Sequence, residues 1–310
     1  MWRYVIKRIL RLIPTFIFVS FIVFWLMSLS GDPASVIAGM EATPEEIEAL
    51  RETMGLNRPL IVRYVEYMAD LIRGDMGTDI FGNNVWDQIS VRFPNTLLLI
   101  VVAIAGSTLI AIPLGIIASL RKGTWTDTGV TTVSLFFNCM PVFWFGMMLQ
   151  TLFAVKLGWL PTSGIEKGLA ISLILPCATS ILSQMAAKCR QTRSAMLDNL
   201  NADFVRTALA KGVPYKRAVL KHAFPNATIP IITVIGTSFA TSVGGSVALE
   251  TVFAWPGVGT LLIPAIRASN YPLVCGCVIL LILLIGLVNL LIDIAYAFAD
   301  PRIKARYIGK

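Results

Sequence analysis

The sequence has little charge and almost no histidine. Asp, Glu, Lys and Arg make up 14% of the 310 residues, and His222 is the single histidine. Ordinary soluble domains carry about 25% charged residues, so a domain folded in water is excluded. One histidine, with no Glu beside it, cannot supply an H-E-x-x-H zinc site. We expect no metal site and no catalytic residue.

A nucleotide-binding loop is also missing. The G-x-x-x-x-G-K-[ST] pattern, whose backbone cradles phosphates, does not occur, and the one Gly-Lys pair is Gly309-Lys310. We therefore expect this chain to bind no cofactor. If ATP drives the protein, the nucleotide and its Mg²⁺ belong to a partner subunit.

The five cysteines do not indicate a disulfide framework. None of them lies in the long polar segment 30–95, and Cys275 and Cys277 are two positions apart on a predicted helix, where they point to different sides. The full set is Cys139, Cys177, Cys189, Cys275 and Cys277.

What the sequence has in abundance is apolar residues, at 56%, gathered into uncharged runs. A helix needs roughly 20 such residues to cross a bilayer. The pattern predicts an all-α polytopic membrane helix bundle with six transmembrane helices, the third kinked at Pro141. The runs are 12–29, 96–120, 130–155, 169–187, 227–249 and 273–299.

The distribution of charge predicts the orientation. Eighteen of the 26 Lys and Arg residues lie at the N-terminus, in the Arg121-Lys122 turn, in the segment 188–222 and in the C-terminal tail. Cationic segments remain in the cytoplasm, so both termini are expected there. The whole chain reads as one transmembrane domain, 1–310, with a cytoplasmic loop at 188–225.

An acidic, extracytoplasmic insert is expected at 30–95, after the first run, because it holds eleven of the 18 acidic residues. Thr43-Pro44-Glu45-Glu46 has the spacing of a capping box. We expect one helix from there to Met54 and a second from Pro59 to Ile72.

Several polar residues within or beside the runs are candidates for a solute pathway. Asn138, Gln184, Ser238 and Thr241 could line it, although such residues equally hold helices together. Asp293 could form a structural polar cluster with Asn289 and Tyr296 on one helix face.

The run Trp255-Pro256-Gly257 follows the fifth apolar run and is preceded by Glu250. It is either a rigid turn, because Pro fixes φ and Gly permits positive φ, or an outer gate or receptor contact.

The most informative stretch is 203–225, which is basic and helix-prone and is interrupted by Gly212 and Pro214. A basic segment can lie on anionic lipid. A helix lying on a membrane gains nothing from a break in its middle, so the pattern favours docking to a partner.

This stretch resembles the cytoplasmic loop of ABC importer permeases, with the pattern Glu-Ala-Ala, three residues, Gly, nine residues, Ile-x-Leu-Pro. Arg206-Thr207-Ala208, Gly212 and Phe224-Pro225 take the corresponding places, with Arg206 replacing the Glu and His222 the Ile. With these two replacements the sequence resembles one branch of the family, the branch that imports dipeptides, oligopeptides, glutathione and nickel. Further matches are Gly31-Asp32-Pro33, Gly74-Asp75-Met76-Gly77, Trp255 to Gly259 and Asp300-Pro301-Arg302.

The resemblance implies a type I-like permease fold and a transport subunit in a bacterial or archaeal inner membrane. It also implies a second related permease, two ATP-binding subunits, an extracytoplasmic solute-binding protein and no nucleic acid. The residues implied in ATPase coupling are Arg206, Thr207, Ala208, Gly212, Val213, Pro214 and Pro225. The alternative is a self-contained channel or ion-coupled carrier, which the few intramembrane charges disfavour.

Overall fold

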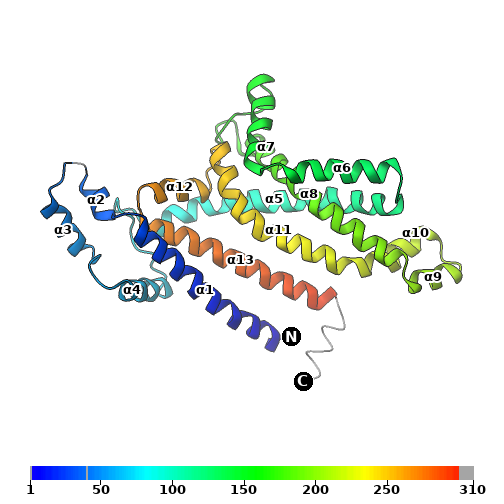
Figure 1. Cartoon of the computed structure of the whole chain (residues 1–310), viewed down its shortest axis with the longest axis horizontal. Helices are drawn as coiled ribbons and strands as arrows, with labels where there is room; N and C mark the ends of the chain where they lie inside the picture. The colour runs from blue at the N-terminus through cyan, green and yellow to red at the C-terminus, as the bar shows by residue number, and fades with distance from the viewer. Residues whose placement is uncertain (1, 40, 300–310) are drawn as a thin grey trace. The chain divides into compact units, whose positions relative to one another are not determined.

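The computed structural model describes residues 2–39 and 41–299, and most of them are helical (Figure 1). The expected all-α fold is confirmed. The chain forms two compact units, and the boundary between them passes through α5 (Val85–Leu120) and α13 (Tyr271–Ala299). The expected motif at 300–302 lies outside the described residues.

The first unit, called the insert unit here, comprises residues 6–97 and 256–286. It contains most of α1, the start of α5, most of α13 and four shorter helices. The bounds are α1 (Trp2–Ser30), α2 (Pro33–Ala38), α3 (Pro44–Thr53), α4 (Leu60–Ile72) and α12 (Gly259–Arg267).

The two helices expected in the insert are present as α3 and α4. The capping box at the start of α3 is complete, since Thr43 Oγ1 accepts from the Glu46 N–H at 3.3 Å and Glu46 Oε2 accepts from the Thr43 N–H at 2.8 Å. Tyr64 of α4 is buried, and its hydroxyl lies 2.8 Å from Ser20 Oγ of α1. The insert is thereby fastened to the first long helix.

The second unit, called the core unit, contains residues 2–5, 98–255 and 287–299. Its longest helices are α8 (Leu169–Leu200) and α11 (Phe224–Phe253), which pack along each other. α8 also packs against α6 and α7, whose bounds are given below. The remaining elements are α6 (Trp125–Cys139), α7 (Val142–Leu149), η1 (Gln150–Lys156), α9 (Asp203–Ala210), α10 (Tyr215–Ala218) and η2 (Val219–Ala223).

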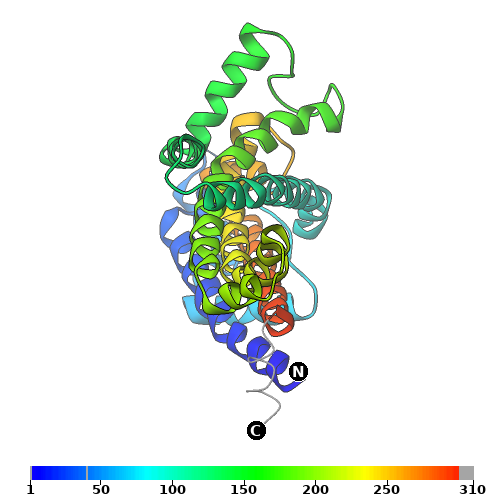
Figure 2. The ribbon, with the colours of Figure 1, turned by 90° about the vertical axis from the view of Figure 1, so that its right-hand side faces the viewer.

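Within the described residues, five helices are long and apolar enough to span a membrane. The sixth expected span, 130–155, is a broken pair in which α6 and the α7–η1 segment meet at 100°. Figure 2 shows the α7–η1 segment, in bright green, directed away from α6. Pro141 explains the break: it lacks an N–H, and it holds Met140 in an extended conformation with ψ 133°. Six spans are obtained when the bent pair counts as one.

The fourth expected run, 169–187, is longer in the structure. α8 continues without interruption to Leu200. Residues 188–200, expected as the start of a loop, are therefore a helical extension of the apolar run.

A tight turn organised by Asp79 precedes α5. The buried carboxylate accepts hydrogen bonds from the backbone N–H groups of Asn83 (2.8 Å) and Phe81 (2.9 Å) and from Gln88 Nε2 (2.9 Å). Burial raises the pKa of Asp79, but these hydrogen bonds outweigh it and hold the pKa below its usual value of 3.8. Their stabilisation is therefore present above pH 3.8 and is lost as the pH falls through the lower folded pKa.

We predict that Asp79→Asn loosens this turn, because an amide replaces one accepting oxygen with a donor. The cost should be about 1–3 kcal/mol. Hydrogen exchange of peptides covering residues 77–88 should be faster than in the wild type at neutral pH. Asp87→Asn, at an exposed carboxylate nearby, is the control and should leave the exchange unchanged; equal exchange in both variants would contradict this role of Asp79.

Candidate functional site

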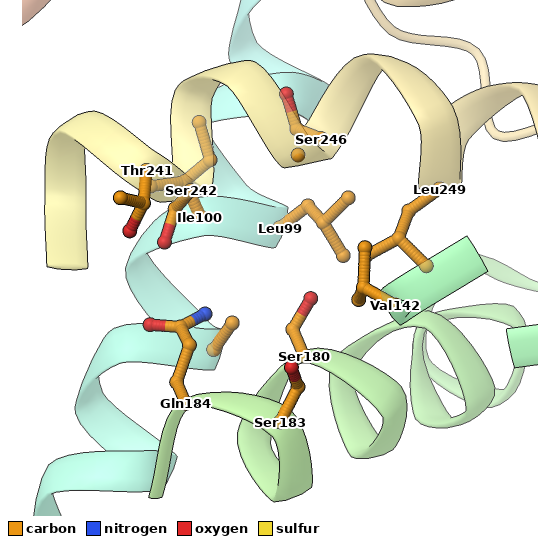
Figure 3. Close-up of a pocket in the computed structure, with 12 residues that line it drawn as sticks. Leu99, Ile100, Val142, Ser180, Ser183, Gln184, Thr241, Ser242, Ser246 and Leu249 are labelled. Carbon is orange, nitrogen blue, oxygen red and sulfur yellow. The ribbon is translucent and has the colours of Figure 1, made fainter. Parts of the chain in front are cut away.

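A cavity of about 140 Å³ lies in the core unit between α5, α7, α8 and α11. Its walls combine apolar side chains with hydroxyls and one carboxamide (Figure 3). The lining residues are Leu99, Ile100, Ala103, Val142, Ser180, Ser183, Gln184, Thr241, Ser242, Gly245, Ser246 and Leu249. A polar cavity inside an apolar bundle is a place where a solute group can leave water.

The polar wall contributed by α8 can donate hydrogen bonds. Ser180, Ser183 and Gln184 fall on one face because they are three or four positions apart. Figure 3 shows the two hydroxyls and the amide directed towards the cavity. Within the described part of the chain, neither serine hydroxyl has a hydrogen-bond partner, so both protons are available to a ligand.

The facing wall, from α11, accepts hydrogen bonds. Ser242 Oγ donates to the Ser238 carbonyl at 2.6 Å, and Thr241 Oγ1 donates to the same carbonyl at 3.0 Å. Since each hydroxyl proton is used within the helix, the oxygens present lone pairs to the cavity. The cavity therefore has a donating side and an accepting side.

Lys188 lies one turn of α8 beyond Gln184 and is buried, with 1% of its surface exposed. Its Nζ donates to Ser107 Oγ (2.5 Å), to the Ile104 carbonyl (3.4 Å) and to Gln184 Oε1 (3.4 Å). The ammonium form can donate all three bonds because it carries three protons, whereas a neutral amine could donate only two. Among the described residues no carboxylate lies within ion-pair distance of this nitrogen, so its positive charge is held by neutral acceptors alone.

Close approach of α5 and α8 makes this arrangement possible. A Cβ on Gly115 would lie 2.7 Å from the Cys189 carbonyl oxygen, and a Cβ on Gly106 would lie 2.5 Å from Ile181 Cδ1. At Gly115 the obstacle is backbone, so a larger residue there would force the helices apart, whereas at Gly106 the obstacle is the end of the Ile181 side chain. The glycines thus bring the Ile104 carbonyl within reach of Lys188.

Two of the four predicted pathway residues, Gln184 and Thr241, line the cavity. Asn138 instead lines a much smaller recess with Ser134 and Arg193. Ser238 is buried, and its hydroxyl donates to the Val234 carbonyl at 2.6 Å, so it stabilises its own helix. The serines of the cavity were not predicted, although the spacing of Ser180, Ser183 and Gln184 was a usable signal.

A partly buried ion pair joins α6 to α8. Arg193 donates to Asp127 through Nε (2.5 Å) and Nη2 (2.7 Å), a bidentate geometry. Asp127 also accepts from the Gly123 N–H at 3.0 Å. The turn before α6 is thereby fastened to the part of α8 that follows Lys188.

The 203–225 segment forms two short helices separated by Gly212. The Gly212 N–H donates to the Leu209 carbonyl (2.9 Å) and the Val213 N–H to the Ala208 carbonyl (3.1 Å), which is a Schellman motif ending α9. Gly212 has φ +82°, a conformation that suits glycine. Pro214 then precedes α10, in agreement with the predicted break.

One face of this segment is packed into the core unit. Val205, Ala218 and Val219 belong to a buried cluster with Met196 of α8 and Ala227 of α11. Ala208, predicted to couple to a partner, is also buried and supports the segment from within.

The other face of the segment is exposed and combines cations with large apolar side chains. Arg206, Thr207, Gly212, Pro214 and Pro225 are exposed, whereas Val213 is half-buried. Four large side chains on this face are 38–60% exposed: Phe204, Leu209, Tyr215 and Leu220. Such a patch with a rigid base suits contact with another protein.

The residues predicted as an outer gate or receptor contact are mostly inaccessible. Glu250, Trp255 and Gly257 are buried, and Pro256 is partly buried. Trp255 packs with Leu99 and Cys177, and its N–H donates to the Glu250 carbonyl at 2.8 Å. This burial favours the rigid turn over a receptor surface.

Asp293 is buried and Asn289 is exposed on α13. The side chain of Tyr296, the third member of the expected polar cluster, lies outside the described residues. The cluster therefore remains a prediction.

Long apolar helices, a polar cavity between them and a structured basic segment with an exposed face define a membrane transport subunit. Residues 1–100 match the family described as the N-terminal part of binding-protein-dependent transport system membrane components, and residues 111–305 match the inner membrane component itself. The chain belongs to this family of ABC importer permeases.

Relatives match over nearly the whole chain. The chain is 39% identical over 306 residues to the glutathione transport system permease protein GsiC of Escherichia coli (strain K12), covering 98% of this chain and 99% of the relative. It is 36% identical over 315 residues to the oligopeptide transport system permease protein AppB of Bacillus subtilis (strain 168), covering 98% and 100%.

The fold is similar to that in a solved structure of the MetNI methionine ABC transporter in an inward facing conformation. The TM-score is 0.58 at 16% identity, with 68% of this chain and 95% of that chain covered. At this identity the likeness concerns the fold.

We predict that the Asp127–Arg193 pair stabilises the core unit. Asp127→Asn should lower the melting temperature of the detergent-solubilised protein, and a double-mutant cycle with Arg193→Gln should give a coupling free energy of about 1–3 kcal/mol. The comparison is Asp203→Asn, which removes the exposed Asp203–Arg206 pair with its 3.9 Å separation and should have almost no effect. Zero coupling at Asp127 and Arg193 would contradict the prediction.

Proposed function

We propose that the chain is one of two permeases in an ATP-driven importer of small peptides, and that it forms half of the translocation pathway. The names of the relatives support this cargo, since they transport glutathione and oligopeptides. The proposal rests mainly on the cavity, because its hydroxyls and carboxamide match the donors and acceptors of peptide groups. The described lining contains no His, Cys, Asp or Glu, so the cavity favours a peptide over nickel.

In this proposal the 203–225 segment faces the cytoplasm and docks on an ATP-binding subunit, while the insert 30–95 faces a solute-binding protein on the other side. The cationic N-terminus and tail support this orientation. Two ATP-binding subunits and a second, related permease complete the assembly. ATP and Mg²⁺ are then bound by the partners.

The proposed route of coupling is a rigid-body displacement. The buried face of the 203–225 segment packs on α8 and α11, which carry the two polar walls of the cavity. A partner that moves the exposed face therefore moves both walls, and this changes the access to the cavity.

Uptake of a labelled tripeptide by proteoliposomes tests the function. The assembled importer with its binding protein and ATP should accumulate the peptide, whereas the assembly with a hydrolysis-deficient ATPase should not. Uptake by this chain alone, without any ATPase subunit, would instead support a channel or carrier. Accumulation of nickel with no uptake of any peptide would overturn the cargo.

We predict that Gly212→Val impairs coupling. The site has open space around it, because a Cβ would meet nothing within 4 Å. The effect comes from the backbone, since positive φ costs a residue with a Cβ about 1–2 kcal/mol. ATP hydrolysis by the assembly should persist while peptide uptake falls.

Gly212→Asn is the matched control, because Asn tolerates this conformation better than other residues with a side chain. It should retain most of the uptake. Normal uptake by Gly212→Val, in an assembly that contains the variant in normal amount, would contradict the coupling role.

A further inference from the structure

Lys188 is a costly feature that the proposed function does not use. An ammonium group within a span costs about 2.5–3.5 kcal/mol on insertion scales. A cation at the membrane surface would extend its amine into water, whereas Lys188 is buried within the bundle, with 1% of its surface exposed. Its partner Ser107 lies deep in α5 and is fully buried.

The contact between Lys188 and Gln184 determines what Gln184 offers to the cavity. An ammonium group only donates, so the oxygen of the carboxamide must face Lys188. The amide nitrogen, a donor, is then turned towards the cavity, as Figure 3 shows. Ser180 and Ser183 add two further protons on the same wall.

The charge of Lys188 reinforces this wall electrostatically. Its field acts through a low-dielectric bundle, where charges interact more strongly than in water. Elsewhere in the described core unit, the positive charge of Arg193 is balanced by the carboxylate of Asp127. Lys188, in contrast, has three neutral acceptors. An anionic group entering the cavity would supply the missing negative charge.

The opposite wall complements the other end of such a solute. Thr241 and Ser242 present accepting oxygens, which suit an ammonium or amide N–H group. A solute with a carboxylate and an N–H donor therefore fits in one orientation, with its carboxylate against α8.

We propose that this cavity receives a carboxylate of the transported solute, with Gln184 as the specificity-determining residue and Lys188 as the residue that positions and charges it. The inference rests on the proposed peptide importer and deepens it by naming the group that the permease recognises. The cavity is large enough for a terminal group with several waters rather than for a whole peptide, since one water needs roughly 10–15 Å³ of such volume.

The experiment compares uptake of a labelled tripeptide with uptake of the same tripeptide as its C-terminal amide, using the assembled importer and one binding protein throughout. The main variant is Gln184→Glu. It is nearly isosteric, and its carboxylate pairs with Lys188, so folding is preserved. The new side chain neutralises Lys188 and presents an acceptor to the cavity in place of a donor.

Gln184→Glu should lower the ratio of free-acid to amide uptake by about tenfold or more, because a charge-assisted hydrogen bond is lost. Uptake of the amide should persist. Gln191→Glu is the matched control: it is the same substitution on the same helix at an exposed position, and the ratio should not change. Lys188→Met should shift the ratio in the same direction as Gln184→Glu.

Two results would overturn the inference while leaving the peptide importer intact. One is an equal fall in the uptake of both peptides, which would assign Lys188 and Gln184 to packing alone. The other is an unchanged ratio in Gln184→Glu. If the wild-type assembly takes up neither peptide, the proposed function fails and the inference fails with it.

Discussion

The core unit depends on the continuity of α8. One uninterrupted helix carries the donating wall of the cavity, the buried Lys188, the ion pair to α6 and the apolar seat of the 203–225 segment. These features all lie after Pro176, in a stretch of the helix that contains no further proline, so they move together with the helix that carries them. A displacement applied at one end of α8 is transmitted to the other.

The placement of polar groups on α8 follows from the cost of burying them. Lys188 is satisfied by three neutral acceptors, and Arg193 by a bidentate carboxylate. The second arrangement is the cheaper one, since the charges cancel. The chain nevertheless keeps Lys188, with its neutral acceptors, beside a polar cavity. This is the physical reason for assigning Lys188 a role in solute recognition.

Much of the fold could be predicted because its signals are local. Uncharged runs mark helices that can span a membrane, Thr43 and Glu46 mark the start of α3, and Gly212 marks the end of α9. The size of the bend at Pro141 was not predictable, because proline explains why a helix stops and tertiary packing decides where the next one points.

The cavity was harder to predict for a related reason. On an apolar helix, polar residues such as Ser238 and Ser242 look alike in sequence, and only the packing of α11 on α8 separates the buried hydroxyl from the one that lines the cavity. Lys188 was placed with the loop cations because the apolar run ends beside it, and composition does not reveal that the helix continues.

The cavity and the 203–225 segment are separated along α8, and the helix connects them mechanically. About 18 Å of α8 separates Lys188 from Leu200, and along that length the helix is held to α5 by glycine-mediated contact and to α6 by the Asp127–Arg193 pair. A helix braced on two sides resists bending, so a partner that displaces the segment must shift α8 together with its neighbours. Both walls of the cavity respond, because α11 shares the same buried cluster at its base. The residues that recognise a solute and those that receive mechanical input can therefore be far apart and still act as one body.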